Sequence, residues 1–244
     1  MLLLAQTAPA SPSFLSNLDT LLFAVFPYVA MAMFFLITIS RYRSHPFTYS
    51  SLSTQFIENR QHFWGLVPFH YGVIAVLTGH VVAFAIPRSV LLWNARPLRL
   101  YILEVSALIF AVLTLVGLIQ SIHRRLTSSK VRTATTPTDW IVLAMLLFQL
   151  GSGMYIAVMH RWGSSWFATS VSPYLWSLVR LNPDISTIVP MPAAVKLHII
   201  SAFLLIAFFP FTRLVHVLVV PNMYLWRRAQ VVRWYRDRRV RSSQ

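Results

Sequence analysis

Five long apolar runs constrain this chain more than any other feature of its sequence. Each is roughly 20 residues long, the length that an α-helix needs to cross a hydrocarbon layer about 30 Å thick. The runs lie at Leu21–Ile39, Phe63–Ile86, Leu100–Ile122, Trp140–Met159 and Lys196–Val220. Lipid cannot hydrogen-bond the backbone, so a spanning segment of this kind must satisfy its own polar groups as a helix. The sequence therefore predicts an all-α, polytopic membrane helical bundle with five transmembrane helices.

The composition agrees with a membrane protein and excludes several soluble classes. Hydrophobic residues make up 57% of the 244 residues and charged residues only 11%, which is too apolar for the surface of a soluble globule. The 21 basic residues exceed the 6 acidic ones, but they flank the apolar runs, so membrane topology explains them better than nucleic acid does. The chain has no cysteine. Disulfides, thiolate metal ligands and a cysteine-ligated iron–sulfur cluster within this chain are therefore excluded.

The basic residues also predict the orientation of the bundle. Fifteen of them fall on one side of the five runs, including Arg60 and the seven arginines of the C-terminal tail, and six fall on the other. By the positive-inside rule the N-terminus is outside and the C-terminus is cytoplasmic, which predicts a multi-pass protein of the cell inner (cytoplasmic) membrane.

Three parts follow from this topology. Residues 1–20 are predicted to form an uncleaved outer tail, because no positive region precedes their short apolar patch. Residues 21–220 form the five-helix domain, and residues 221–244 form a basic cytoplasmic tail. In this tail Trp226, Trp234 and Tyr235 lie among the arginines. Arginine and aromatic residues are enriched at protein interfaces, so we expect the tail to dock partner subunits, with anionic lipid as a contributor.

Two connectors between the apolar runs contain residues that predict local helical structure. The segment TATTPTD before the fourth run offers threonine and aspartate side chains that can cap a helix. The longest connector, 161–195, contains SPYLWSLV at residues 172–179. We predict a short surface helix there, covering the outer end of the bundle.

Four of the eight histidines fall within the predicted spans: His70, His80, His198 and His216. An ionisable side chain inside a membrane is costly, so function is the first hypothesis for it. Along straight helices the first two lie ~15 Å apart and the last two about 27 Å apart, on one face. The second and fifth spans run in opposite directions. They therefore offer two facing pairs, His70 with His216 on the cytoplasmic side and His80 with His198 on the outer side.

Each pair can supply two axial nitrogens to one haem iron, a type of site that bundles build from facing helices. Helix rise alone places the two irons roughly 21 Å apart. Ligation by two histidines leaves no open iron position, which predicts electron transfer and not oxygen binding. Zinc or di-iron is a weaker interpretation, because these helices lack the carboxylates that such sites use. Hydrogen bonding between helices, and a haem-free transporter or proton channel with a histidine relay, remain open alternatives.

Two residues beside these histidines have a structural and a functional interpretation. Arg213 lies three residues before His216, on the same helix face, and can either pair with a haem propionate or extend its side chain to the interface. Gly79 lies next to His80 and can either admit a flat ring or serve helix packing.

Several longer motifs carry a family resemblance. They are FPYVA in the first span, FHYGVIAVLTGH in the second, RRL followed by VRTATTPTD, and KLH through FPFTRLVH to VPNMYLWRR. With these motifs the chain resembles the gamma subunit of membrane-bound respiratory nitrate reductase, a di-haem cytochrome b, over nearly its whole length. The two histidine spacings and the FPFTRLVH context are the specific part of this resemblance.

The resemblance implies which cofactors the chain binds and in which direction electrons pass through them. It implies two haem b groups, the inner bound by His70 and His216 and the outer by His80 and His198, with Arg125 and Arg213 as haem-propionate contacts. A quinol, menaquinol or ubiquinol, would be oxidised near the outer haem. Electrons would then pass inward to an iron–sulfur (beta) subunit and a molybdenum catalytic (alpha) subunit. The chain has no molybdenum or nucleotide motif, so the terminal nitrate chemistry is expected elsewhere.

The chain departs from the family at the quinol pocket. The family's lysine after the second span falls, by ungapped counting, at Leu100, beside an arginine. Quinol-site candidates are Gly79, His80, Arg96, Arg99 and Lys196. Interfacial anchoring is the alternative role for the basic ones. The direction of electron flow is open at this point, since a subunit of the same type can serve a nitrite oxidoreductase or a related molybdoenzyme in reverse.

Overall fold

The computed structural model of the protein describes residues 14–45 and 62–219, which are helical over most of their length. The elements are α1 (Phe14–Thr20), η1 (Leu21–Val25), α2 (Phe26–Ser44), α3 (His62–Ala85), α4 (Pro87–Asn94), α5 (Pro97–Thr127), α6 (Ser129–Thr133), α7 (Pro137–Met159), α8 (Gly163–Trp166), η3 (Phe167–Val171), α9 (Ser172–Val179), α10 (Ala193–Phe208), η4 (Phe209–Phe211) and η5 (Arg213–Val219). Arg60, the first residues of the predicted outer tail and the predicted basic tail 221–244 lie outside the described residues.

Five helical segments are long and apolar enough to cross a membrane. They are Asn17–Ser44, Gly65–Ala85, Pro97–Thr127, Pro137–Met159 and Ala193–Phe211. The prediction of an all-α bundle with five membrane helices is thereby confirmed. The first segment begins earlier than the predicted Leu21, because α1 continues into α2 through the π-helical turn η1.

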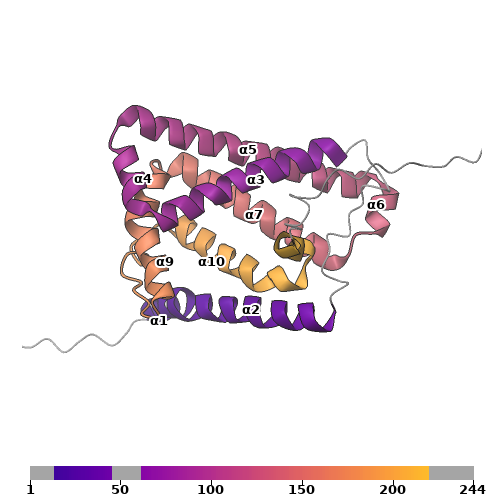
Figure 1. Ribbon diagram of the computed structural model, residues 1–244, viewed down its shortest axis with the longest axis horizontal. Helices are drawn as coiled ribbons and strands as arrows, with labels where there is room; N and C mark the ends of the chain where they lie inside the picture. The colour runs from indigo at the N-terminus through magenta and orange to yellow at the C-terminus, as the bar shows by residue number, and fades with distance from the viewer. Residues whose placement is uncertain (1–13, 46–61, 220–244) are drawn as a thin grey trace, which may run out of the picture.

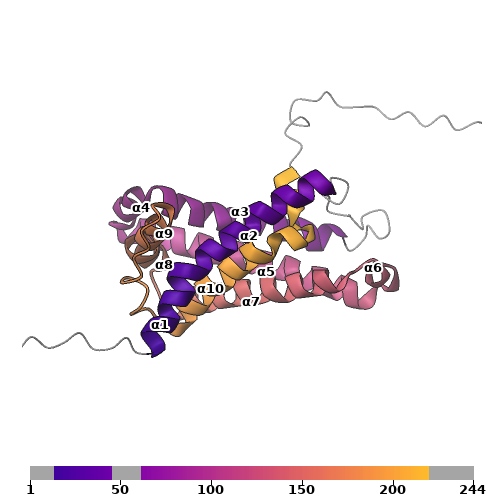
Figure 2. The same cartoon turned by 90° about the horizontal axis from the view of Figure 1, so that it is seen from below.

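The helices form an elongated bundle (Figures 1 and 2). The main packing contacts follow the order α2, α10, α7, α5 and α3. In Figure 1, α1, α4 and α9 lie at one end of the bundle, called the α9 end below, and α6 lies at the other, called the α6 end. The spanning helices therefore join two ends that are covered by different short helices.

Two glycines allow α3 and α5 to approach closely. A β-carbon on Gly72 would lie 2.7 Å from the carbonyl oxygen of Phe110, and one on Gly117 would lie 2.7 Å from the carbonyl oxygen of Gly65. Such distances are too short for any side chain, so the backbones themselves are in contact. Membrane helices associate through packing of this kind, because lipid tails are as apolar as their side chains.

A capping box starts α7, as the TATTPTD segment predicts. The amide of Thr136 donates to Asp139 Oδ2 at 2.8 Å, and the amide of Asp139 donates to Thr136 Oγ1 at 3.4 Å. Each side chain satisfies a backbone donor that the first helical turn leaves unpaired. This end of α7 also carries the carboxylate of Asp139 into the α6 end of the bundle.

The prediction of one continuous helix from Lys196 to Val220 is wrong. The α-helix ends at Phe208 and gives way to the short 3₁₀ turn η4, after which Thr212 is extended. Pro210 explains the break, because it has no amide hydrogen and its ring clashes with the preceding turn. The straight-helix separation expected for the two histidines of this span does not apply, since η5 is a separate 3₁₀ segment.

Side-chain hydrogen bonds to the backbone stabilise the break between η4 and η5. Arg41 of α2 donates to the carbonyl oxygens of Pro210 and Thr212, the latter at 3.0 Å. The Thr212 hydroxyl oxygen accepts from the amide of Leu214 at 3.0 Å, which starts η5. The carbonyls freed by the break are thus satisfied inside the bundle, as a membrane requires.

The predicted surface helix over SPYLWSLV is confirmed as α9. Its Ser172 hydroxyl donates to the carbonyl oxygen of Ala83 at 2.8 Å. Its Trp176 ring stacks on the ring of Phe84, with centroids 4.9 Å apart. The Tyr174 hydroxyl donates to the carbonyl oxygen of Phe23 at 2.7 Å. Burial raises the pKa of Tyr174, which keeps this hydroxyl a donor. The α9 helix therefore ties the end of α3 to the first span.

We expect Gly117→Ala to destabilise the protein by about 1–3 kcal/mol, because the added methyl group overpacks the α3–α5 contact. The thermal unfolding midpoint in detergent measures this change. Gly151→Ala is the matched control, since a β-carbon there meets no atom within 4 Å. Equal midpoints for the two variants would contradict the close-packing assignment.

Candidate functional site

The structure brings His70 of α3 and His216 of η5 together in the half of the bundle toward the α6 end. Their ring centroids lie 6.3 Å apart and their planes are inclined by 63°. Two imidazoles on one metal, each bonded at about 2 Å, have centroids about 6 Å apart once the ring radii are added. The spacing of this pair therefore fits one metal ion between the two rings.

Three of the four span histidines share one hydrogen-bond arrangement. Their Nδ1 atoms lie 2.6–2.8 Å from a carbonyl oxygen of the same helical segment: His70 with Leu66, His80 with Val76 and His216 with Arg213. A carbonyl oxygen can only accept, so Nδ1 carries the hydrogen and Nε2 of the neutral ring carries the lone pair. Metal-ligating histidines are commonly held in this way by their second nitrogen.

His198 reaches the same tautomer by a different route. Its Nδ1 lies 2.9 Å from the hydroxyl oxygen of Ser152 on α7. Ser152 donates its own hydrogen to the carbonyl oxygen of Gln149 at 3.0 Å, so its oxygen accepts from Nδ1–H. The amide nitrogen of Gln149 lies 3.2 Å from His198 Nε2, and its amide oxygen accepts from Ser201. A metal at Nε2 would therefore replace the bond from Gln149 and leave the bond to Ser152.

The second predicted pair, His80 and His198, lies toward the α9 end without direct ring contact between the two among the described residues. The exposed ring of His80 packs edge-on against Phe167 of η3, with centroids 5.5 Å apart. A β-carbon on Gly153 would lie 3.0 Å from the ring of His198, so this glycine makes room for it. The two histidines are within electrostatic range of each other. They share one region, but each has its own protein partner.

Arginines gather at the α6 end around one carboxylate. Arg213 forms an ion pair with Asp139, Nε to Oδ1, at 3.1 Å. Asp139, Arg124 and Arg213 all act electrostatically on Arg125, and Arg124 is only 4% exposed. The predicted propionate contacts, Arg125 and Arg213, thus belong to one group of three guanidinium ions and one carboxylate. This group keeps an excess of positive charge in the half of the bundle that holds His70 and His216.

The other candidates lie toward the α9 end with separate neighbours. A β-carbon on Gly79 would meet no atom within 4 Å. The Lys196 ammonium is 3.0 Å from a carboxylate oxygen of Asp19, and the Arg99 guanidinium lies 5.2 Å from the centre of the Trp93 ring. Arg96 precedes the first turn of α5. The structure brings these four residues to the same end of the bundle. Lys196 and Arg99 are held at this end by Asp19 and Trp93.

Sequence reasoning missed three polar residues within the spans. Gln149 and Ser152 hold His198, and Glu104 of α5 accepts hydrogen bonds from Ser164. The available signal was a polar side chain inside an apolar run, which is costly in a membrane and therefore needs a partner or a role. In the described part of the chain, no three His, Cys, Asp or Glu side chains converge as a metal cluster. The candidate centres are therefore histidine pairs.

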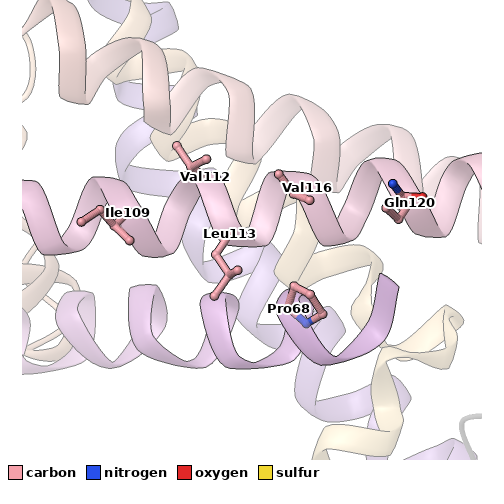
Figure 3. A pocket seen from close by; sticks show the side chains of 6 residues that line it. All are labelled: Pro68, Ile109, Val112, Leu113, Val116 and Gln120. Atoms are coloured by element: carbon pink, nitrogen blue, oxygen red, sulfur yellow. The ribbon is translucent and has the colours of Figure 1, made fainter. Parts of the chain in front are cut away.

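An apolar groove lies between α3 and α5 (Figure 3). Its volume is about 450 Å³, and it is lined by Pro68, Ile109, Val112, Leu113, Val116 and Gln120. Pro68 is two residues before His70, which is about 200° around a helix. The groove therefore opens away from the histidines and has the character of a lipid-facing surface.

Comparison with known proteins identifies the family. Residues 19–235 match the model of the nitrate reductase gamma subunit family. The chain belongs to this family. It is 29% identical to the nitrate reductase gamma chain of Bacillus subtilis over 216 residues, covering 87% of this chain and 97% of that one. It is 30% identical to the respiratory nitrate reductase 2 gamma chain of Escherichia coli over 223 residues, covering 88% and 97%.

A more distant similarity covers about half of the chain. A dihydromethanophenazine:CoB–CoM heterodisulfide reductase subunit of Methanosarcina barkeri is 29% identical over 119 residues, covering 49% of this chain and 39% of that one. The family resemblance drawn from the sequence motifs is confirmed. As a gamma-subunit family member with five apolar helices, the protein is a multi-pass membrane component of an electron-transferring oxidoreductase complex.

Proposed function

We propose that this chain is the membrane anchor and di-haem cytochrome b subunit of a nitrate reductase, oxidising quinol and passing the electrons to an iron–sulfur subunit. The observation that carries the proposal is the pair His70 and His216, whose rings lie 6.3 Å apart. Their Nε2 atoms are free of the backbone bonds that hold Nδ1. This spacing and this tautomer are what two axial ligands of one iron require.

His70 and His216 would hold the inner haem, which supplies one-electron redox chemistry at an iron with no open position. Arg125 and Arg213 would bind its carboxylates; the ion pair of Arg213 with Asp139 in the same group supports this role. The surplus positive charge of these arginines favours an added electron at this end. It therefore favours electron movement from the α9 end toward the α6 end.

His80 and His198 would hold the outer haem. The region fits a planar group, because His80 is exposed and Gly79 has open space where a side chain would be. Ser152 fixes the ring of His198, while the bond from Gln149 to Nε2 gives way on ligation. The quinol site would lie beside this pair, with Gly79, His80, Arg96, Arg99 and Lys196 as its candidate residues.

Topology and relatives support the remaining assignments. The positive-inside rule places the α6 end and the basic tail in the cytoplasm, in the inner membrane. There the chain would dock the iron–sulfur (beta) subunit, which passes electrons to the molybdenum (alpha) subunit for nitrate reduction. The Methanosarcina relative is named for a reductase of a different substrate with dihydromethanophenazine as the donor. That name favours a reduced small-molecule carrier as the donor here too.

A dithionite-minus-oxidised absorption spectrum with an iron assay tests the proposal. We expect two b-type haems per chain, and reduction of both by a quinol. A purified complex without iron and without reduced-haem bands would overturn the cytochrome assignment and favour a haem-free channel with a histidine relay. A complex whose haems receive electrons from its molybdenum subunit and deliver them to a quinone would instead be a related molybdoenzyme running in reverse.

We expect His216→Ala to remove the inner haem and leave the outer one, because His216 lies on η5 whereas the two histidines proposed for the outer haem lie on α3 and α10. The haem-to-protein ratio should fall from two to one, and electron delivery to the partner subunits should stop. His123→Ala is the control, since this exposed histidine on α5 lies outside both pairs. Simultaneous loss of both haems in His216→Ala would argue against independent sites.

Ser152→Ala should raise the midpoint potential of the outer haem alone. The Ser152 oxygen accepts from Nδ1–H of His198, which makes the imidazole a better donor to the oxidised iron. If the bond favours binding to oxidised over reduced iron tenfold, its loss raises the midpoint potential by about 60 mV for a one-electron couple. A redox titration followed by absorbance measures the shift. Ser106→Ala removes a similar hydroxyl, bonded to its own helix at Leu103, and should shift neither potential.

A further inference from the structure

One carboxylate lies inside a membrane span and has no ion-pair partner within residues 14–45 and 62–219. Glu104 is seven residues into α5, about 10 Å below the α9 end of that helix. Asp19 and Asp139 pair with Lys196 and Arg213, but among the described residues Glu104 has no cation within 4.0 Å. A carboxylate in this position is costly, so a functional role is the first hypothesis for it.

The packing of α3 against α5 places Glu104 level with His80. These helices are antiparallel, and Gly72 of α3 faces Phe110 and Thr114 of α5. Eight residues from Gly72 toward the α9 end lies His80. The turn of α5 that faces Gly72 is 110–114. The segment 102–106, which contains Glu104, lies eight residues from this turn in the same direction. The carboxylate and the histidine therefore lie at the same depth on neighbouring helices.

One helical turn links the two residues. Glu104 Oε1 accepts from the amide and the hydroxyl of Ser164, at 2.8 and 2.6 Å. Phe167 follows three residues later and contacts the ring of His80 at 5.5 Å. The turn Ser164–Phe167 thus contacts the carboxylate with its first residue and the histidine with its last.

A polar chain continues from Ser164 toward the corner between α4 and α5. The Asn94 amide nitrogen donates to the hydroxyls of Ser164 and Ser165, at 2.9 and 3.0 Å. Asn94 is 9% exposed, and its amide oxygen is a buried acceptor without a hydrogen-bond partner in the described part of the chain. A buried acceptor of this kind calls for a donor such as a hydroxyl group or water. The cluster therefore offers both a base and a further acceptor for a hydroxyl proton.

We propose that Glu104 is the proton acceptor for quinol oxidation at the outer haem, with Ser164 and Asn94 holding it in place; this rests on the function proposed above. One O–H bond of the quinol breaks, and its proton forms an O–H bond with a Glu104 carboxylate oxygen. The accompanying electron would pass to the ferric iron that His80 and His198 would hold, and from there to the inner haem, so that the outer iron could accept a second electron. Glu104 releases the proton to the α9 end, and a second proton and electron leave in the same way to give quinone.

The other charged and titratable groups around this end include Arg88 of α4, Arg96, Arg99 and Tyr101 of α5, Tyr155 and His160 at the end of α7, Arg161 before α8, Arg180 after α9, His80 of α3, His198 of α10 and the ion pair of Asp19 with Lys196. The arginines are permanently charged in the working pH range. They add positive charge to this end of the bundle, through which the proton leaves. With its Nε2 on the haem iron, His80 would not serve as the base, because the carbonyl oxygen of Val76 holds Nδ1–H.

Glu104→Gln in the whole complex tests the proposal, with menadiol as the electron donor. Glutamine keeps an oxygen that accepts both bonds from Ser164, so the turn stays in place while the base is lost. We expect unchanged haem content and midpoint potentials, unchanged reduction by dithionite, and at least a tenfold slower reduction of haem by menadiol. Asp184→Asn is the control, because it removes an exposed carboxylate from the long connector and should leave the rate unchanged.

A second measurement does not depend on turnover. In a redox-difference infrared spectrum, menadiol should produce a protonated-carboxyl C=O band that is absent in Glu104→Gln. A wild-type rate and an unchanged band in this variant would overturn the proposal. Loss of the outer haem or a shift of its potential would also overturn it, by making Glu104 a structural anchor of α8. A wild-type complex without haem, or with haem that menadiol does not reduce, would instead contradict the proposed function.

Discussion

The close contact between α3 and α5 supports the rest of the structure. In lipid, helices gain no hydrophobic driving force from burying apolar side chains and associate through close packing, so the approach allowed at Gly72 and Gly117 sets their separation and register. That register fixes the depths of His70 and His80 and places Glu104 level with the latter. A bulkier residue at either glycine would move both histidines of α3 relative to α7 and α10.

A break in the last span provides the second constraint. Because Pro210 ends α10 early, His216 lies on a separate segment that turns toward His70. The break persists in a membrane because Arg41 satisfies carbonyls that the helix no longer uses. The ion pair of Arg213 with Asp139 then ties the new segment to the start of α7. Each of these contacts joins a different helix to the same histidine pair.

The two ends of the bundle differ in chemistry. Toward the α6 end, a close histidine pair is accompanied by arginines, an environment that favours electrons and acidic groups. Toward the α9 end, a turn of the long connector lies over His80, His198 is held by side chains of α7, and Glu104 offers a base. The function proposed above requires an asymmetry of this kind, because electrons would enter with release of protons at the α9 end and leave at the α6 end.

The five spans, the family, the capping box of α7, the helix α9 and the set of four span histidines could all be predicted from the amino-acid sequence. These features depend on neighbouring residues, through apolar run length, capping chemistry and motif spacing. The side-chain partners across helices could not be predicted and come from the packed structure: Asp139 for Arg213, Ser152 and Gln149 for His198, and Ser164 for Glu104. Pro210 marked the position of the break in the last span. The carbonyl oxygens at the break are satisfied by Arg41, which is 169 residues away in the chain. Such contacts depend on the rotation and approach of whole helices, which packing at a few glycines sets and no local pattern encodes.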